Sequence, residues 1–442
     1  MNKFLRRLII AFFLGFSLLA TGIAFASNHA DSIEINEMSL HDYLIENYGY
    51  AFIQNHNHAL EMISELYGLF PTSRMGATIY PAYFGGLYIN EDGELVILKL
   101  EDGLSNSNTM IARFEDAIIK PAEFSYQALV ATMDFLNATI TDPVMSNTSA
   151  WSLDVIGNQV VVALIDYNPD AIDLFRNTIL DSPIITFEQG DIITMDGVFH
   201  EEQRQEMAAF SVPLFGTTRP SATQPMIQNP RPQIRTGDQI WFYRAGRGWI
   251  DHLSVGYRAS NLWGEPGFVS AAHRDVPFLP LPLFGGGLQV GDIVTNHFGA
   301  RIGVVHQARL QGIDAIFVAT DPGVVVHSHG PLTYDGIVVG QLVLSRGAQS
   351  GYQFATILNA NTSASVGTLL NPIRIDQGIR ADINLIDGDS GGVVYTVTVN
   401  PHTNMAEVRG IAGINIAGNG LLANGLFSRA DNINRILHLS LR

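Results

Sequence analysis

The sequence predicts an α+β region over residues 27–211, followed by an all-β region over residues 234–442. Three observations support this division. Helix-like and strand-like stretches alternate in the first region, whereas short β-rich runs separated by glycine and turn residues follow one another in the second. Between them, residues 212–233 contain five prolines among Thr, Ser, Gln and Asn. That composition favours an extended linker, accessible to proteases.

The first 26 residues have the pattern of an export signal. Lys3, Arg6 and Arg7 form a basic start, an uncharged apolar run extends from residue 8 to 26, and Ala24-Phe25-Ala26 provides the small residues of a cleavage site. We therefore expect a secreted protein. The apolar run is close to membrane-spanning length, so the alternative is an uncleaved membrane anchor.

Residues 27–211 contain one helix and two hairpins with clear local signals. The stretch Tyr126–Leu136 repeats its apolar residues on one helical face. A first hairpin, Leu87–Leu98, turns at Gly93, and a second, Trp151–Ala163, turns at Gly157-Asn158. Glycine suits both turns because it adopts a positive φ easily. The hairpins start 64 residues apart, which fits either a duplicated α/β unit or coincidence.

The all-β region contains ten short β-rich runs. Runs at this spacing are typical of a barrel or a sandwich. The length of the region suits two barrels of roughly 100 residues each. Only Asp431–Leu437 has a helical pattern, and Asp431 is its expected N-cap.

Composition excludes several classes of function. The chain has no cysteine, which rules out disulfides, thiol catalysis and Cys-based metal sites. A net charge of −17 argues against nucleic-acid binding, because phosphates attract Lys and Arg. The charge is unevenly placed: residues 28–233 carry −20, whereas residues 234–442 balance 14 Arg against 14 acidic residues and contain no Lys. We expect no metal and no cofactor, since no ligand cluster has convincing spacing.

The most specific motif is Gly388-Asp389-Ser390-Gly391-Gly392. A serine hydroxyl becomes a nucleophile when a neighbouring base accepts its proton. The flanking glycines let the backbone turn tightly and direct N–H groups to one point, where they can bind a developing oxyanion. The alternative interpretation is an ordinary glycine-rich β-turn.

A nucleophilic serine needs a base and an orienting carboxylate. His273 follows a strand-like run and two small residues, which leave room for an imidazole in a cleft, and Asp314 precedes a strand-like run. Asp292 and Asp321 are the alternatives to Asp314, although both have the context of turn residues. The histidines that compete with His273 are His252, His297, His306, His327, His329, His402 and His438.

These motifs, in this order, resemble the chymotrypsin-like serine proteases. The closer resemblance is to the bacterial branch that contains the streptogrisins and alpha-lytic protease. It rests on Ser254–Tyr257, Gly267–His273, Asp314–Val318, Ser345–Gly351, Gly388–Gly392 and Gly410–Asn415. The hairpin units upstream also resemble the pro-region of that branch.

The resemblance implies two six-stranded antiparallel β-barrels over residues 234–442, of the trypsin-like type. It implies a pro-region over 27–211 that acts as folding aid and inhibitor and is cleaved within 212–233. It also implies roles for individual residues. Ser390 would be the nucleophile, His273 the general base and acid, and Asp314 the orienting carboxylate, with the N–H groups of Gly388 and Ser390 forming the oxyanion hole.

Two further implications concern the surroundings of the site. Arg346 is expected to form a buried bidentate pair with Asp389, and Gly413, Ile414 and Asn415 are expected to bind substrate as a strand. The predicted function is a secreted serine endopeptidase that acts on polypeptides and is monomeric when mature. The alternatives are an envelope protein that cleaves only its own linker, and a catalytically silent binding module, since a fold does not fix a function.

Overall fold

The computed structural model describes residues 44–73, 78–101, 111, 113–190, 232–273, 287–328, 333–334, 336–368, 371–400, 406–419 and 424–441. The expected signal (1–26) and nearly all of the linker (212–231) lie outside these ranges, so both remain predictions. Among the described residues, no helix is long and apolar enough to cross a membrane.

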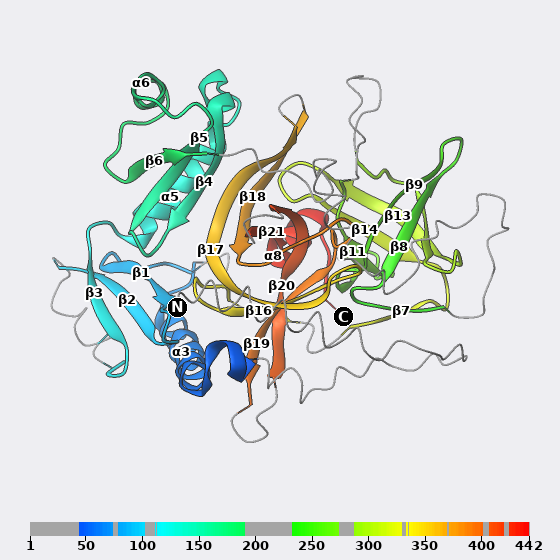
Figure 1. Ribbon diagram of the computed structural model, residues 1–442, viewed down its shortest axis with the longest axis horizontal. Coiled ribbons are helices and arrows are strands. Elements are labelled where there is room, and N and C mark those ends of the chain that lie inside the picture. The colour runs from blue at the N-terminus through cyan, green and yellow to red at the C-terminus, as the bar shows by residue number, and fades with distance from the viewer. Residues whose placement is uncertain are drawn as a thin grey trace.

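The first unit of the N-terminal half is a helix followed by three strands, at the left of Figure 1. Strand β2 pairs antiparallel with β1 and parallel with β3. Gly93 in the β1–β2 turn has a φ of +83°, which confirms the predicted glycine turn. The elements are α3 (Tyr50–Leu69), β1 (Phe84–Ile89), β2 (Leu95–Leu100) and β3 (Ile118–Ala122).

The second unit repeats this strand pattern. Strand β5 pairs antiparallel with β4 and parallel with β6. The predicted helix is present as α5, where the Ser125 hydroxyl accepts a hydrogen bond from the backbone N–H of Ala128. The shared pattern favours the duplication hypothesis. The elements are α5 (Tyr126–Ala138), a 3₁₀ turn (Pro143–Asn147), β4 (Thr148–Asp154), β5 (Gln159–Leu164), α6 (Pro169–Thr178) and β6 (Ile185–Gln189).

The turn of the second hairpin differs from the prediction, because its left-handed residue is Asn158 (φ +52°) and not Gly157. Asn158 is buried, and its amide oxygen accepts hydrogen bonds from the backbone N–H groups of Glu123 and Phe124. Its amide nitrogen donates to the carbonyls of Gly85 and Phe124. This side chain therefore joins the first unit to the second.

The C-terminal half contains a seven-stranded sheet, at the right of Figure 1, in the order β10-β11-β14-β13-β12-β8-β9. Six strands were expected. The seventh strand arises because residues 255–257 separate β9 from β10. The strands are β8 (Gln239–Arg244), β9 (Gly248–Ser254), β10 (Arg258–Ser260), β11 (Pro266–Ser270), β12 (Ile293–Asn296), β13 (Arg301–Arg309) and β14 (Ala315–Thr320).

The second sheet of this half has six strands of its own, in the order β16-β19-β20-β21-β18-β17. A further pairing of β16 with β17 closes these six into a ring. The long β17 also pairs with β4, so β4, β5 and β6 extend the same sheet into the N-terminal half. The strands are β16 (Leu342–Gly347), β17 (Gly351–Thr368), β18 (Asn371–Ala381), β19 (Val393–Val399), β20 (Ala406–Asn419) and β21 (Asn424–Arg429).

One apolar cluster joins the two sheets of the C-terminal half. It includes Phe317 from the first sheet, Val393 from the second, and Ile433 and Leu437 from α8 (Ala430–Leu437). The helix matches its predicted span, but its N-cap is Arg429. Asp431 instead lies in the first turn, where its carboxylate binds the Arg429 guanidinium.

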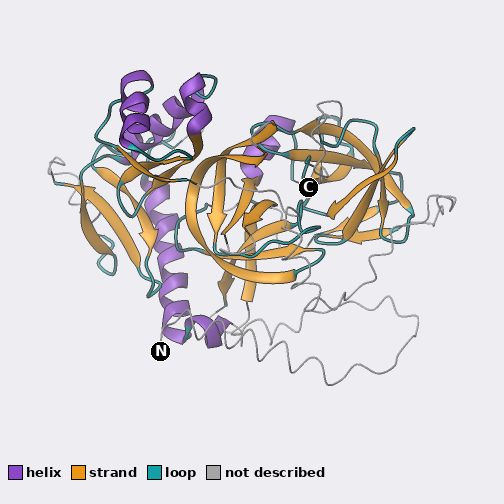
Figure 2. Cartoon of the chain, turned by 45° about the horizontal axis from the view of Figure 1, so that its top comes forward, coloured by secondary structure: helices purple, strands orange, loops and turns teal. Residues whose placement is uncertain are grey.

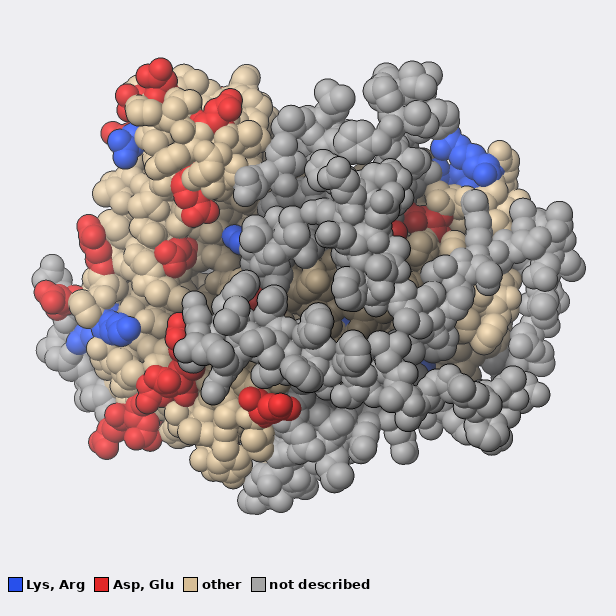
Figure 3. Space-filling model, in the orientation of Figure 1, with Lys and Arg blue, Asp and Glu red and all other residues tan. Residues whose placement is uncertain are grey.

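The N-terminal half also contacts the second sheet through α3. In α3, the His56 ring accepts a hydrogen bond from the N–H of Leu342 at the start of β16, and the Asn57 side chain bonds Val399 at the end of β19. Figure 2 shows the long α3 beside the strands of the C-terminal half. Acidic side chains gather over the N-terminal half in Figure 3, as the uneven charge of the sequence predicts.

Candidate active site

His273 lies just after β11, between the two sheets of the C-terminal half. Its side chain is only 2% exposed, and the small residues Ala271 and Ala272 that precede it are buried too. Strand β11 pairs with β14 through Ser270 and Ile316, so the end of β11 comes beside the residue that precedes β14.

That residue is Asp314, which is fully buried and has a φ of +41°. One carboxylate oxygen accepts backbone hydrogen bonds from Ala272 (3.0 Å) and His273 (2.7 Å). The other oxygen binds Nδ1 of the His273 ring. Two backbone donors thus fix the carboxylate, which in turn fixes the ring so that Nε2 faces away from it.

Ser390 completes the group, because its Oγ lies 2.9 Å from Nε2 of His273. Three residues far apart in the sequence therefore form one chain of contacts, from Asp314 through His273 to Ser390. All three are at most 2% exposed. The geometry is that of a serine whose proton can pass to an imidazole held by a carboxylate.

The turn that carries Ser390 has two glycines in the left-handed region, Gly388 (φ +91°) and Gly391 (φ +83°). A Cβ at Gly388 would lie 2.8 Å from Cγ of Gln349, and one at Gly391 would lie 2.2 Å from Oγ of Ser270. Both positions therefore need glycine for conformation and for space. The Asp389 N–H turns back to the carbonyl of Ile386, which tightens the turn.

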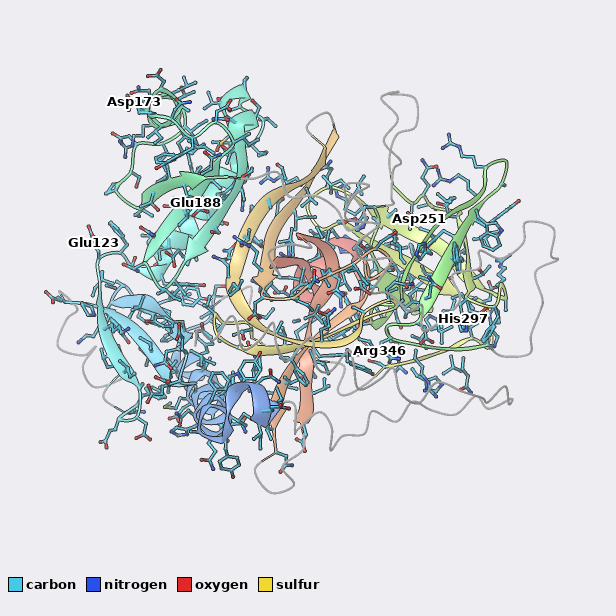
Figure 4. The ribbon with its side chains drawn as sticks, viewed as in Figure 1. Glu123, Asp173, Glu188, Asp251, His297 and Arg346 are labelled. Carbon is cyan, nitrogen blue, oxygen red and sulfur yellow. The ribbon has the colours of Figure 1, made fainter. Side chains whose placement is uncertain are left out.

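The predicted pair between Arg346 and Asp389 is wrong. The Arg346 guanidinium lies 3.8 Å from Asp238 and stacks over the ring of Tyr352; Figure 4 shows Arg346 on the side of the second sheet that faces β7 (Gln233–Arg235). The Asp389 carboxylate instead accepts backbone hydrogen bonds from Ile386, Gln349 and Ser350.

These backbone donors replace a cation as partners of a fully buried carboxylate. Burial raises the pKa of Asp389, and its hydrogen bonds with Ser350, Ile386 and Gln349 oppose that rise. Burial also raises the pKa of Asp238, against the nearby charge of Arg346. Sequence analysis missed Asp238, which carries no motif of its own.

The two alternative aspartates have other partners. Asp292 forms a bidentate pair with Arg244, with both N–O distances at 2.6 Å, and Asp321 pairs with Arg301 on the surface. Among the competing histidines, His252 stacks on Trp241 at 4.8 Å, and its Nε2 would lie 3.1 Å from a Cβ at Gly388. His329 and His402 lie outside the described residues.

The structure also changes the expected substrate strand. Gly413 and Ile414 pair with β19 on one edge and with β21 on the other, which leaves neither edge for a substrate. Asn415 is fully buried and exchanges backbone hydrogen bonds with Gly391 and Gly392. The ladder with β19 ends at Ile414, and the carbonyl of Ile416 lies 3.3 Å from Oγ of Ser390.

No group of three or more His, Asp or Glu side chains able to hold a metal is found in the described part of the chain.

Comparisons with known proteins bear mainly on the N-terminal half. Residues 26–121 match the family model of the Pro-like N-terminal domain, and residues 127–190 match that of the Pro-like C-terminal domain. These two matches confirm the resemblance of the N-terminal half to the pro-region of proteases of the alpha-lytic type. No curated protein matches the chain.

Similar solved structures cover 48% of this chain. They include a protease from Nocardiopsis (21% identity, all of that chain, TM-score 0.35), protease A from Thermobifida fusca (18%, 98% of that chain, 0.35) and a chymotrypsin from Cellulomonas bogoriensis (21%, 99% of that chain, 0.34). At these TM-scores and identities the likeness does not define an activity.

Proposed function

We propose that the chain is the precursor of a serine endopeptidase whose nucleophile is Ser390. The observation that carries the proposal is the contact chain from Asp314 through His273 to Ser390, with 2.9 Å between Nε2 and Oγ. Matches to both domains of a protease pro-region support it independently, because they lie in a different part of the chain.

The residues suggest the following steps. Oγ of Ser390 attacks the carbonyl carbon of the scissile peptide bond while Nε2 of His273 accepts its proton. The C–N bond then breaks, and His273 returns the proton to the leaving amine. Water, deprotonated by the same ring, hydrolyses the acyl-enzyme and restores Ser390. Asp314 holds the ring and stabilises the imidazolium throughout.

The developing oxyanion would be bound by the N–H groups of Gly388 and Ser390. A donor of this kind contributes about 2.7–4 kcal/mol to transition-state stabilisation. The polypeptide substrate would add as a strand to β20 beyond Asn415, at residues 416–418, where β21 occupies the other edge.

The pro-region is proposed to act within the same molecule as folding aid and inhibitor. Its strand β4 pairs with β17 and so extends the second sheet of the C-terminal half, and Arg374 of β18 donates to the carbonyl of Asn137. Export through residues 1–26 and cleavage within 212–233 would then release a mature enzyme, expected to be a monomer.

The test is active-site labelling of the full-length precursor and its processed product with a serine-directed phosphonofluoridate. The proposal expects an adduct on Ser390 of the processed form and none in the Ser390→Ala variant. Absence of an adduct on wild-type Ser390 after processing would refute it. Digestion of a peptide library then separates a general endopeptidase from a protein that cleaves only its own linker.

A further inference from the structure

Ser254, the last residue of β9, contacts both residues of the proposed oxyanion hole. Its backbone N–H donates to the carbonyl of Ser390 (2.8 Å), and its hydroxyl donates to the carbonyl of Gly388 (2.7 Å). The residue is fully buried. Two hydrogen bonds from one residue thus fix the turn on both sides of Asp389.

The direction of the Ser254 hydroxyl is determined by its neighbours. The backbone N–H of Ala348 donates to the same Oγ at 2.8 Å. Since a hydroxyl has one proton and Ala348 is itself a donor, the Ser254 proton goes to Gly388. This hydroxyl therefore also ties the segment after Arg346 to the turn.

The Gly388–Asp389 peptide is held at both of its polar ends. Its carbonyl accepts from Ser254, and its N–H donates to the carbonyl of Ile386 at 3.0 Å. Gly388 has no Cβ and a φ of +91°, so its backbone has little intrinsic restraint. Without the Ser254 hydroxyl, one of the two anchors of this peptide is lost, and the neighbouring N–H donors lose their fixed direction.

Ser254 also contacts the strand that carries the base. Its carbonyl accepts a hydrogen bond from the hydroxyl of Ser270 at 2.8 Å, three residues before His273. Ser270 is equally buried, and its hydroxyl donates to the carbonyl of Ser254 and not to that of Gly388. It therefore provides a matched control: a buried serine hydroxyl in the same network that makes no hydrogen bond to the carbonyl of Gly388.

We propose that Ser254 is a positioning residue for the oxyanion hole, which orients the Gly388 turn through its hydroxyl. The inference rests on the proposed peptidase function. In this role the Ser254 hydroxyl, at the end of a strand of the first sheet, does not touch the substrate. It supports transition-state binding by holding the Gly388 turn of the second sheet in place.

The experiment compares Ser254→Ala with Ser270→Ala in the full-length precursor after processing. Rates on a peptide p-nitroanilide are divided by the concentration of active sites titrated with a phosphonofluoridate, so that unfolded protein does not count. We expect kcat of Ser254→Ala to fall at least ~10-fold, while KM stays within twofold of wild type. This loss is smaller than the ~10²–10³-fold loss of kcat that follows outright removal of an oxyanion donor. Affinity for a peptidyl aldehyde, whose adduct carries an oxyanion, should fall in parallel.

Several outcomes would overturn the inference. A kcat for Ser254→Ala within twofold of that for Ser270→Ala would do so, as would a rise in KM at constant kcat. If Ser254→Ala does not fold, Ser254→Cys, which keeps nearly the same volume with a much weaker donor, is measured in the same way and must show the same kcat loss. Failure of wild type itself to label or turn over would instead refute the proposed function.

Discussion

We predict that His56 makes the contact between the N-terminal half and the second sheet of the C-terminal half sensitive to pH. Its ring is 1% exposed, and Nε2 accepts the backbone N–H of Leu342 at 3.1 Å, which requires an unprotonated nitrogen. Burial, and secondarily the charge of Arg409, lower the pKa of His56 from 6.5 to about 4.

The direction of the pH effect on stability follows from the lowered pKa of His56. Above pH 6.5 the His56 ring is neutral in both the folded and the unfolded chain, so its titration takes nothing from the free energy of unfolding. As the pH falls from 6.5 to about 4, only the unfolded chain gains the proton, and the free energy of unfolding decreases by about 1.4 kcal/mol per pH unit. The total loss is about 3 kcal/mol, and it stops below pH 4, where the folded form is protonated too.

The assay is urea unfolding of the Ser390→Ala precursor, which cannot process itself, at pH 7.5 and pH 4.5. His56→Gln removes the titrating group while its amide oxygen can still accept from Leu342, so it should lose about 2.5 kcal/mol less than the parent. His58→Gln is the control, because His58 lies on the same helix but is half exposed. Equal pH dependence in His56→Gln and the parent would refute the reasoning.

Three further predictions use matched pairs of variants. Asp292→Asn should lower the free energy of unfolding by roughly 3–5 kcal/mol, because it leaves the largely buried Arg244 charge without its partner. Asp321→Asn, in the exposed pair with Arg301, should change it by only about 0–1 kcal/mol in chemical denaturation, and similar losses in the two variants would contradict this prediction. Asn158→Ala should destabilise the precursor more than Asn158→Gly by about 1–2 kcal/mol. Both variants lose the hydrogen bonds of the side-chain amide, but only alanine is strained by the positive φ at this position; an alanine variant that is the more stable of the two in thermal unfolding would exclude this strain. Arg374→Ala should weaken binding of the cleaved pro-region about 10-fold, a loss of about 1.4 kcal/mol, because Arg374 bonds Asn137 and stacks over Trp151. The control in a dissociation titration is Arg309→Ala, because the Arg309 side chain bonds the nearby Gln311; equal affinities of the two variants would contradict a role of Arg374 in holding the pro-region.

Local sequence was sufficient for features that depend on neighbouring residues. The α5 helix and both hairpins of the pro-region were predicted, because helical period, turn residues and strand alternation act over a few residues. The residue types of the candidate site were also recognisable, since Ser390, His273 and Asp314 each stand in a short distinctive context. The structure brings these three together as predicted.

Predictions that needed a register or a partner were less successful. Strand β19 pairs with Gly413 and Ile414 and so occupies the edge that was expected to bind substrate, and the register between two strands leaves no local signal. Arg346 was assigned to Asp389, but the fold brings Asp238 nearer to it and surrounds Asp389 with backbone donors.

The sequence by itself determined the division into an α+β and an all-β part, the uneven charge, and the chemical groups available at the candidate site. Only the tertiary structure decided where β20 is paired with β19 among the described residues, which groups satisfy Asp389, and that Ser254 anchors the turn at Gly388. The physical reason is that composition and local pattern fix which groups a segment offers. Their partners depend on hydrogen bonds between separate segments, 134 positions apart for Ser254 and Gly388 and 40 for Gln349 and Asp389, and these form only when the strands pack together.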